Sequence, residues 1–243
     1  MNYAVINQPA GIGDIFFLQK GIDSIISNGW NVVWPVNKHF SYLNDYIKKD
    51  NLTFYNIEDD YPFKEDIDFK KNIPIEFIKN DNIVKYIPLD HAQHINGISF
   101  MKAKYALLGI SSEDWKNSFI FSRNQNRENK LKQKYNIEDG QDFIFVNNIF
   151  ASPPDTIIRD MEISSNMKVI YNDGKPCHIF DYCWIIENAK ELHLVESAFC
   201  YLVEVLDTNA KLFMYSRIIN GRPQHNNFDY VDHVYKKNWF KIL

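Results

Sequence analysis

The chain of 243 residues is 45% hydrophobic and 24% charged, enough apolar sequence for one large domain or two small ones. Its formal net charge is −4 and its basic residues are spread along the chain, so no nucleic acid partner is expected. Three cysteines without CxxC spacing argue against a disulfide framework and a structural zinc site. Without a signal-peptide pattern or a run of roughly 20 apolar residues, we expect a cytoplasmic protein.

The beginning of the chain alternates between strand and helix patterns. Residues 3–7 are apolar and predict a buried strand. A repeat at helical spacing follows, formed by Ile15, Leu18, Ile22 and Ile25. Asp14 suits the start of this helix and Asn28-Gly29 its end, and "WNVVWPV" then predicts a second strand stopped by Pro35. Strand, helix and strand in this order form a βαβ unit, which implies a parallel sheet.

The middle of the chain is less regular. Residues 51–57 and 82–89 predict two short strands, and "FMKAKYALLGI" predicts a helix that ends at Gly109. Residues 121–140 are polar and charged, and we interpret them as the crossing between two halves, with a helix over residues 127–135.

The second half repeats the alternation more clearly. Four segments predict strands, "DFIFVNN", "MKVIYND", "ELHLVES" and "AKLFMYS", and two predict the helices between them, "HIFDYCWIIENA" and "AFCYLVEVLD". This is the doubly wound pattern. We therefore predict an α/β fold of two Rossmann-like halves facing a central cleft, with residues 1–125 in the first half and 126–243 in the second.

The glycine turn in "NQPAGIGDIFF" follows the first predicted strand. Gly11 and Gly13 permit a tight turn, and the next helix offers free N–H groups. A dinucleotide fingerprint is disfavoured, because Phe16 occupies its third glycine position and no acid ends the second strand. Asp14 is then either a helix cap or a carboxylate presented to a hydroxyl group as a general base, and one role does not exclude the other.

Polar residues also follow the predicted strands of the second half. Glu196 and Ser197 open a helix at the carboxyl edge of the sheet, where the N–H groups of Ala198 and Phe199 suit a diphosphate. Each of these residues alone could be a turn or cap residue, but their convergence on one edge indicates a binding site. The further candidates are Asn147, Asn148, Tyr171, Asn172, Asp173, His178 and, after the last strand, Arg217 or Arg222.

Two other segments give weaker indications. Asp90, His91 and His94 lack an established ligand spacing, and the acidic residues 58–60 are interpreted as a solvated loop, so we predict no metal site. The C-terminal "VYKKNWFKIL" is open to two interpretations, a peripheral contact with a membrane surface or a last helix packed across the first half, and we favour the second.

Two stretches suggest a family. "GIGDIFFLQKGIDSI" resembles the start of GT-B sugar-nucleotide transferases, especially the heptosyltransferase-like group, which open with a strand, a Gly-x-Gly-Asp turn and an apolar helix. "HIFDYCWIIENAKELHLVESAFCYLVEVL" is similar to their second half, although "ESAF" is closer to the serine-rich version in fucosyltransferase-like members. The resemblance covers both ends of the chain and leaves the middle unassigned.

This resemblance implies a glycosyltransferase with a nucleotide-sugar donor as co-substrate and no separate cofactor. Asp14 would be the catalytic base on the acceptor side, and the donor diphosphate would lie at Glu196, Ser197 and Ala198 in the second half. We expect transfer to a glycan or other hydroxyl acceptor, independent of metal and with inversion. Two alternatives stay open: another nucleotide-binding enzyme such as an epimerase or dehydrogenase, and a non-catalytic carbohydrate-binding protein.

Overall fold

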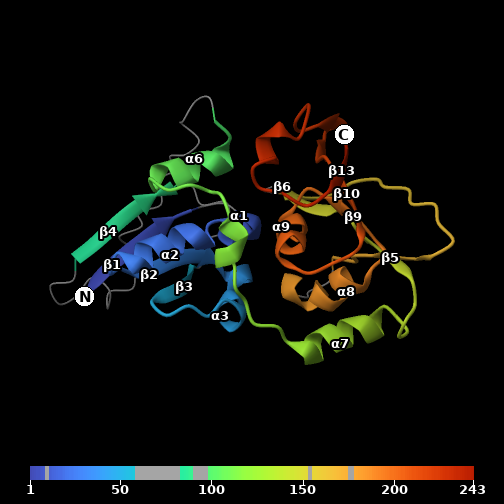
Figure 1. The fold of residues 1–243 in the computed structure, drawn as a ribbon, viewed down its shortest axis with the longest axis horizontal. Coiled ribbons are helices and arrows are strands. Elements are labelled where there is room, and N and C mark those ends of the chain that lie inside the picture. Colours follow the sequence, from blue (N-terminus) through green and yellow to red (C-terminus); the bar gives the residue numbers. More distant parts are fainter. Residues whose placement is uncertain (9–10, 58–82, 90–97, 153–154, 175–177) are drawn as a thin grey trace. The chain divides into compact units, whose positions relative to one another are not determined.

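The computed structural model describes residues 1–8, 11–57, 83–89, 98–152, 155–174 and 178–243. The chain divides into two compact units, Met1–Ser122 and Arg123–Leu243, called here the N-terminal and C-terminal units (Figure 1). The acidic residues 58–60, the histidine-containing residues 90–94 and Cys177 lie outside the described residues.

The N-terminal unit is built on four parallel strands in the order β3-β2-β1-β4. Its elements in chain order are β1 (Asn2–Asn7), α1 (Ile12–Phe17), α2 (Gln19–Ser27), β2 (Asn31–Asn37), a 3-10 turn (Lys38–Phe40), α3 (Leu43–Tyr46), β3 (Leu52–Ile57), β4 (Ile83–Pro88), α6 (Phe100–Leu107) and a second 3-10 turn (Trp115–Ser118). The predicted strands are confirmed, and so is the helix ending at Gly109, which takes a φ of 70° just after α6.

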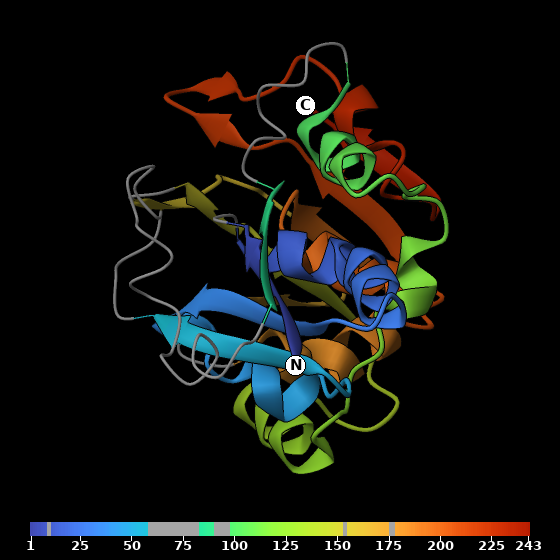
Figure 2. The ribbon, with the colours of Figure 1, turned by 90° about the vertical axis from the view of Figure 1, so that its left-hand side faces the viewer.

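The first helical segment differs from its prediction in two ways. It begins at Ile12 with Gly11 as N-cap, so Asp14 stands within the first turn and does not cap the helix. The helix is also interrupted at Leu18, and a second helix, α2, begins at Gln19. Both α2 and α6 border the edge strand β4 (Figure 2).

Pro35 does not stop the second strand, as the sequence had suggested. β2 continues to Asn37 and keeps its register with β3, where Pro35 lies opposite Tyr55. The ladder between β2 and β1 ends at Val33, so Pro35 has a strand neighbour on one side only. A proline lacks a backbone N–H, and this position tolerates it because the sheet does not need a donor on both sides there.

The C-terminal unit holds a sheet of five parallel strands in the order β13-β10-β9-β5-β8. Its elements are α7 (Gln125–Lys134), β5 (Phe143–Asn147), the hairpin of β6 (Ile149–Ser152) and β7 (Asp155–Ile158), β8 (Lys168–Tyr171), a 3-10 turn (Ile179–Tyr182), α8 (Cys183–Asn188), β9 (Glu191–Val195), α9 (Ala198–Val205), β10 (Lys211–Tyr215), the short β11 (Ile218–Ile219) and β12 (Arg222–Pro223), a 3-10 turn (Asp229–Val231) and β13 (Trp239–Ile242). The four strands predicted for this half are confirmed, and so are the helices predicted over residues 127–135, 178–189 and 198–207, the second of which begins with the 3-10 turn.

The strand order of this sheet contains a topological switch point. β8 lies on one side of β5, while β9, β10 and β13 lie on the other. In open parallel sheets the crevice at the carboxyl ends of the strands beside such a point is where ligands bind. In this unit the point falls between β5 and β9.

The C-terminal segment corrects a prediction. It contains the strand β13, which pairs with β10, and not a helix packed across the first half. Glu204 of α9 holds this segment: its buried carboxylate accepts hydrogen bonds from the backbone N–H groups of Lys236 and Lys237 and from Nε1 of Trp239.

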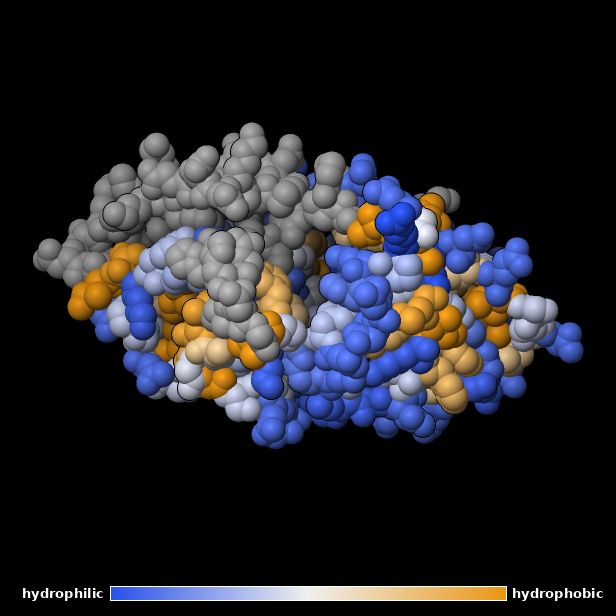
Figure 3. Space-filling model, turned by 90° about the horizontal axis from the view of Figure 1, so that it is seen from above, coloured by the Kyte–Doolittle hydropathy of each residue, from blue (hydrophilic) through white to orange (hydrophobic). Residues whose placement is uncertain are grey.

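The next two observations concern membrane spans and the surface of the described residues. None of their helices is long and apolar enough to pass through a membrane. Seen from above, the C-terminal unit carries hydrophilic and hydrophobic residues side by side (Figure 3).

Candidate functional site

Three of the predicted site residues form a hydrogen-bonded row across the carboxyl ends of β8, β5 and β9. Nδ2 of Asn172 donates to Oδ1 of Asn147 at 2.8 Å, and Nδ2 of Asn147 donates to Oγ of Ser197 at 3.3 Å. Asn147 is fully buried at the end of β5. We call Asn172, Asn147 and Ser197 the strand-end row. The row lies at the switch point of the C-terminal sheet. The sequence pattern had indicated that these side chains converge on the carboxyl edge of the sheet.

Asn148 and Tyr171 lie at the same strand ends, but their side chains bind backbone carbonyl groups and not the strand-end row. The side chain of Asn148 donates to the carbonyl of Arg159 at 3.1 Å, and the hydroxyl of Tyr171 donates to the carbonyl of Met161 at 3.1 Å. Both residues therefore fasten the segment that crosses from β7 to β8.

Arg159, in that segment, was not singled out by the sequence. It is 8% exposed, its guanidinium donates to the carbonyls of Ser216 and Leu243 and lies over the ring of Tyr215, and its Nε has no hydrogen-bond partner in the described structure. Burial lowers the pKa of Arg159.

His178 has the capping role that was weighed against ligand binding. It is the N-cap of the 3-10 turn before α8 and forms a capping box with Asp181, whose carboxylate accepts from the His178 backbone N–H at 3.0 Å. Arg127 of α7 also binds this carboxylate through two nitrogens, at 2.9 and 2.8 Å. His178 therefore has a structural role as a cap, whether or not it also binds a ligand.

Glu196 and Arg217 form a partly buried ion pair next to the strand-end row. Nε of Arg217 lies 2.8 Å from Oε2 of Glu196 and also 2.8 Å from the Glu196 backbone oxygen. The Glu196 side chain is 7% exposed and that of Arg217 is 28% exposed. Burial acts to lower the pKa of Arg217, but Glu196 and three neighbouring tyrosines outweigh it, so the pKa lies above its ordinary value.

The hydroxyls of Tyr230 and Tyr235 complete the surroundings of this carboxylate, at 3.5 and 3.3 Å from its oxygens. With one nitrogen of its guanidinium engaged by Glu196, Arg217 keeps its two terminal nitrogens without a hydrogen bond in the described part of the chain. A guanidinium held in this way can still donate two parallel bonds to a phosphate.

The start of α9 also offers donors. Ser197 is the N-cap of this helix, but its hydroxyl makes no capping hydrogen bond and is instead held by Asn147. Among the described residues, the N–H groups of Ala198 and Phe199 have no acceptor. Free N–H groups at the start of a helix favour an anion. Here they follow Glu196, the ion-pair partner of Arg217, by two and three positions in the chain.

Asp14 of the N-terminal unit is ion-paired. Its Oδ1 contacts Nζ of Lys104 in α6, and the Lys104 side chain is 0% exposed against 16% for Asp14. Burial lowers the pKa of Lys104, and the charge of Asp14 partly opposes this. Sequence analysis missed Lys104; the one signal was a lysine between Ala103 and Tyr105, both buried on the packed side of a predicted helix.

Gln8, immediately after β1, is a second residue that the sequence did not single out. It is 3% exposed, and neither polar atom of its side-chain amide has a hydrogen-bond partner in the described structure. Burying an unpaired amide is costly, so such a group calls for an explanation, and a bound water or ligand is the common one. Gln8 stands three residues before Gly11, at the same sheet edge as the glycine turn.

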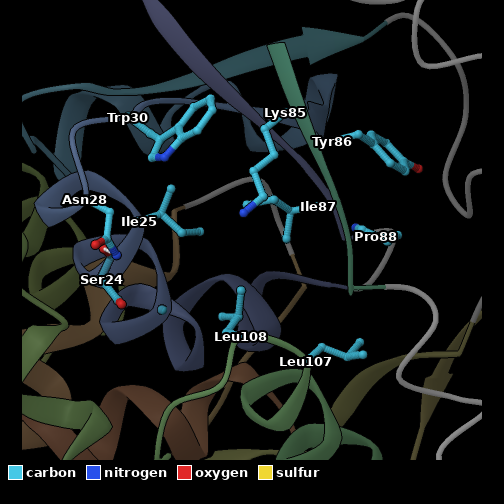
Figure 4. A pocket seen from close by; sticks show the side chains of 11 residues that line it. Ser24, Ile25, Asn28, Trp30, Lys85, Tyr86, Ile87, Pro88, Leu107 and Leu108 are labelled. Atoms are coloured by element: carbon cyan, nitrogen blue, oxygen red, sulfur yellow. Dashed lines mark hydrogen bonds between the residues drawn. The ribbon is translucent and has the colours of Figure 1, made fainter. Parts of the chain in front are cut away.

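A cavity of about 470 Å³ opens on the N-terminal unit, but away from these residues. It lies between α2, β4 and α6, with Trp30 and Lys85 pointing into it and Tyr86 on the opposite side of β4 (Figure 4). No residue of the predicted site lines it. Within the described residues there is also no cluster of three His, Cys, Asp or Glu side chains arranged to hold a metal ion.

Comparisons with known proteins place the fold. No family model matches the chain, and no curated protein sequence matches it. Solved structures do match it, and two of them are described here. A glycosyl transferase of family 9 from Veillonella parvula DSM 2008 aligns with a TM-score of 0.52 at 9% identity, covering 88% of this chain and 80% of that one. The E. coli heptosyltransferase WaaC, solved with ADP, aligns with a TM-score of 0.50 at 11% identity, covering 100% of this chain and 93% of that one. The chain therefore has the GT-B fold of the family 9 heptosyltransferases, with two Rossmann-like halves, as the sequence predicted.

Proposed function

We propose that the chain is a glycosyltransferase that moves a sugar from a nucleotide-sugar donor to a hydroxyl group of a glycan or similar acceptor. The observation that carries this proposal is a group of hydrogen-bond donors at the switch point of the C-terminal sheet. These are the free N–H groups at the start of α9 and the guanidinium of Arg217. The chain also shares its fold with a heptosyltransferase whose structure holds ADP, a nucleoside diphosphate.

The donor nucleotide binds to the C-terminal unit in this proposal. Ala198 and Phe199 donate their N–H groups to the diphosphate, and Arg217 donates from its terminal nitrogens. The strand-end row fixes the position of Ser197 and thereby the first turn of α9. The remaining residues proposed for the donor side are Asn148, Tyr171, His178 and Glu196, together with Asn147 and Asn172 of the row.

The N-terminal unit supplies the base. Gly11 and Gly13 form the turn that leads into α1, and Asp14 stands in its first turn. The acceptor oxygen attacks the anomeric carbon while its proton passes to Oδ2 of Asp14. The bond from the anomeric carbon to the diphosphate breaks, and the leaving charge is met by the N–H groups and Arg217 rather than by a divalent ion. A single displacement of this kind inverts the anomeric configuration.

Two experiments test this proposal. A thermal-shift screen with nucleoside diphosphates and their sugar conjugates is expected to raise the melting temperature, whereas nicotinamide cofactors leave it unchanged. A shift with the cofactors alone would instead favour a dehydrogenase or epimerase, and glycan binding without release of nucleotide would favour a non-catalytic protein. Chelation by EDTA should leave transfer intact.

The variant Asp14→Asn tests the base directly. With the donor and acceptor that the screen identifies, kcat should fall by about a hundred- to ten-thousand-fold, the usual contribution of a positioned base. The Kd of the donor should stay unchanged, because the donor groups belong to the other unit. Full activity of the variant would refute the role of Asp14.

A further inference from the structure

The pair of Asp14 and Lys104 joins two helices that are far apart in sequence. Asp14 lies in α1 and Lys104 in α6, and the Lys104 ammonium contacts Oδ1 of the carboxylate. Among the described residues, the ammonium also lies 4.1 Å from the centroid of the Phe100 ring and 3.7 Å from the sulfur of Met101. Lys104 is fully buried, whereas Asp14 keeps 16% of its side chain exposed.

Stability alone does not account for this pair. Removing an ammonium and a carboxylate from water costs several kcal/mol per ion, and apolar replacements of buried pairs are often neutral or stabilising. A buried pair at the residue proposed as catalytic base therefore suggests a functional reason. The geometry agrees, because one carboxylate oxygen is held by Lys104 and the other, Oδ2, has no hydrogen bond in the described structure.

The other charged or titratable side chains of the neighbouring helices are occupied elsewhere. On α2, Lys20 donates to the carbonyl of Glu113 and Asp23 pairs with Lys49. On α6, Lys102 is exposed and the hydroxyl of Tyr105 donates to the carbonyl of Phe17. Within the described residues Lys104 is thus the charged group in contact with Asp14.

We propose that Lys104 is a positioning residue for the transfer reaction: it holds Oδ1 of Asp14 and balances its charge, so that Oδ2 is aimed as the proton acceptor. The proposal rests on the proposed function, in which Asp14 is the base.

The test compares kcat and the KM of the donor in wild type, Lys104→Met and Lys104→Arg. In Lys104→Met, kcat should fall about tenfold through lost orientation of Asp14. The KM of the donor should not change, and Lys104→Arg should restore most of kcat. If Lys104→Met does not fold, Lys104→Gln, which is neutral but keeps a hydrogen-bond donor, replaces it.

Lys49→Met is the matched control, because Lys49 is also a partly buried lysine that pairs with an aspartate of this unit. Its removal should reduce stability and leave kcat unchanged. An unchanged kcat in Lys104→Met, or the same loss of kcat in Lys49→Met, would overturn the inference while leaving the proposed function intact. A wild-type protein that transfers no sugar from any donor would instead overturn the proposed function, and the inference with it.

Discussion

The ion pair of Glu196 and Arg217 offers a prediction in which stability and ligand binding can be separated. In Arg217→Met, Glu196 is left with two long contacts to tyrosine hydroxyls, at 3.3 and 3.5 Å, and no cation. Breaking a fully buried pair costs roughly 3–5 kcal/mol. Because 28% of the Arg217 side chain is exposed, water screens part of the interaction, and we expect a loss of about 2–3 kcal/mol in the free energy of unfolding.

The double variant Glu196→Gln/Arg217→Met should regain most of this loss, since no uncompensated charge remains buried. Urea denaturation followed by circular dichroism measures the stability of both variants and of the wild type. Donor binding should behave differently: both variants that lack Arg217 lose affinity for a nucleoside diphosphate, whatever their stability. A single variant as stable as wild type, or a double variant that binds the nucleotide normally, would show that the reasoning about this pair is wrong.

Three further predictions concern single residues. Glu204→Ala removes the acceptor for two backbone N–H groups and for Nε1 of Trp239, and should lower the unfolding free energy by about 3 kcal/mol in urea denaturation. Gln8→Met replaces an unpaired buried amide and should raise it by about 1–2 kcal/mol; a large loss would mean that the amide has a protein partner. Burial lowers the pKa of His193 below its ordinary value, against the raising effect of Glu191, so the unfolded chain binds a proton first as the pH falls. Wild type should therefore lose stability more steeply than His193→Gln between about pH 7 and pH 5, and equal slopes would contradict this.

The regular elements of the C-terminal unit could be predicted because their apolar residues are continuous and flanked by turn residues. The strand-end row followed from the same pattern: parallel strands end at one edge, so Asn147, Asn172 and Ser197 had to lie near each other. What the pattern could not tell is that these side chains bind each other, whereas Asn148 and Tyr171 turn to the backbone of the crossing segment.

The features that were missed depend on contacts between distant segments. Lys104 reads as an ordinary helix lysine until α6 packs against α1 and buries its ammonium beside Asp14. Pro35 was expected to end a strand, because the sequence around it does not show how far the neighbouring strands pair with β2. The four residues of β13 form a strand by pairing with β10. They are held there by a hydrogen bond to Glu204, which lies more than thirty positions earlier in the chain.

Each of the two large sheets takes all its strands from one uninterrupted stretch of sequence, residues 2–88 for one and 143–242 for the other. Among the described residues, neither stretch contributes a strand to the sheet of the other, so each sheet forms its backbone ladders from its own stretch alone. Such an arrangement lends itself to recombination: a chimera joined near residue 122 would cut through neither ladder, so one unit could be exchanged while the other is kept.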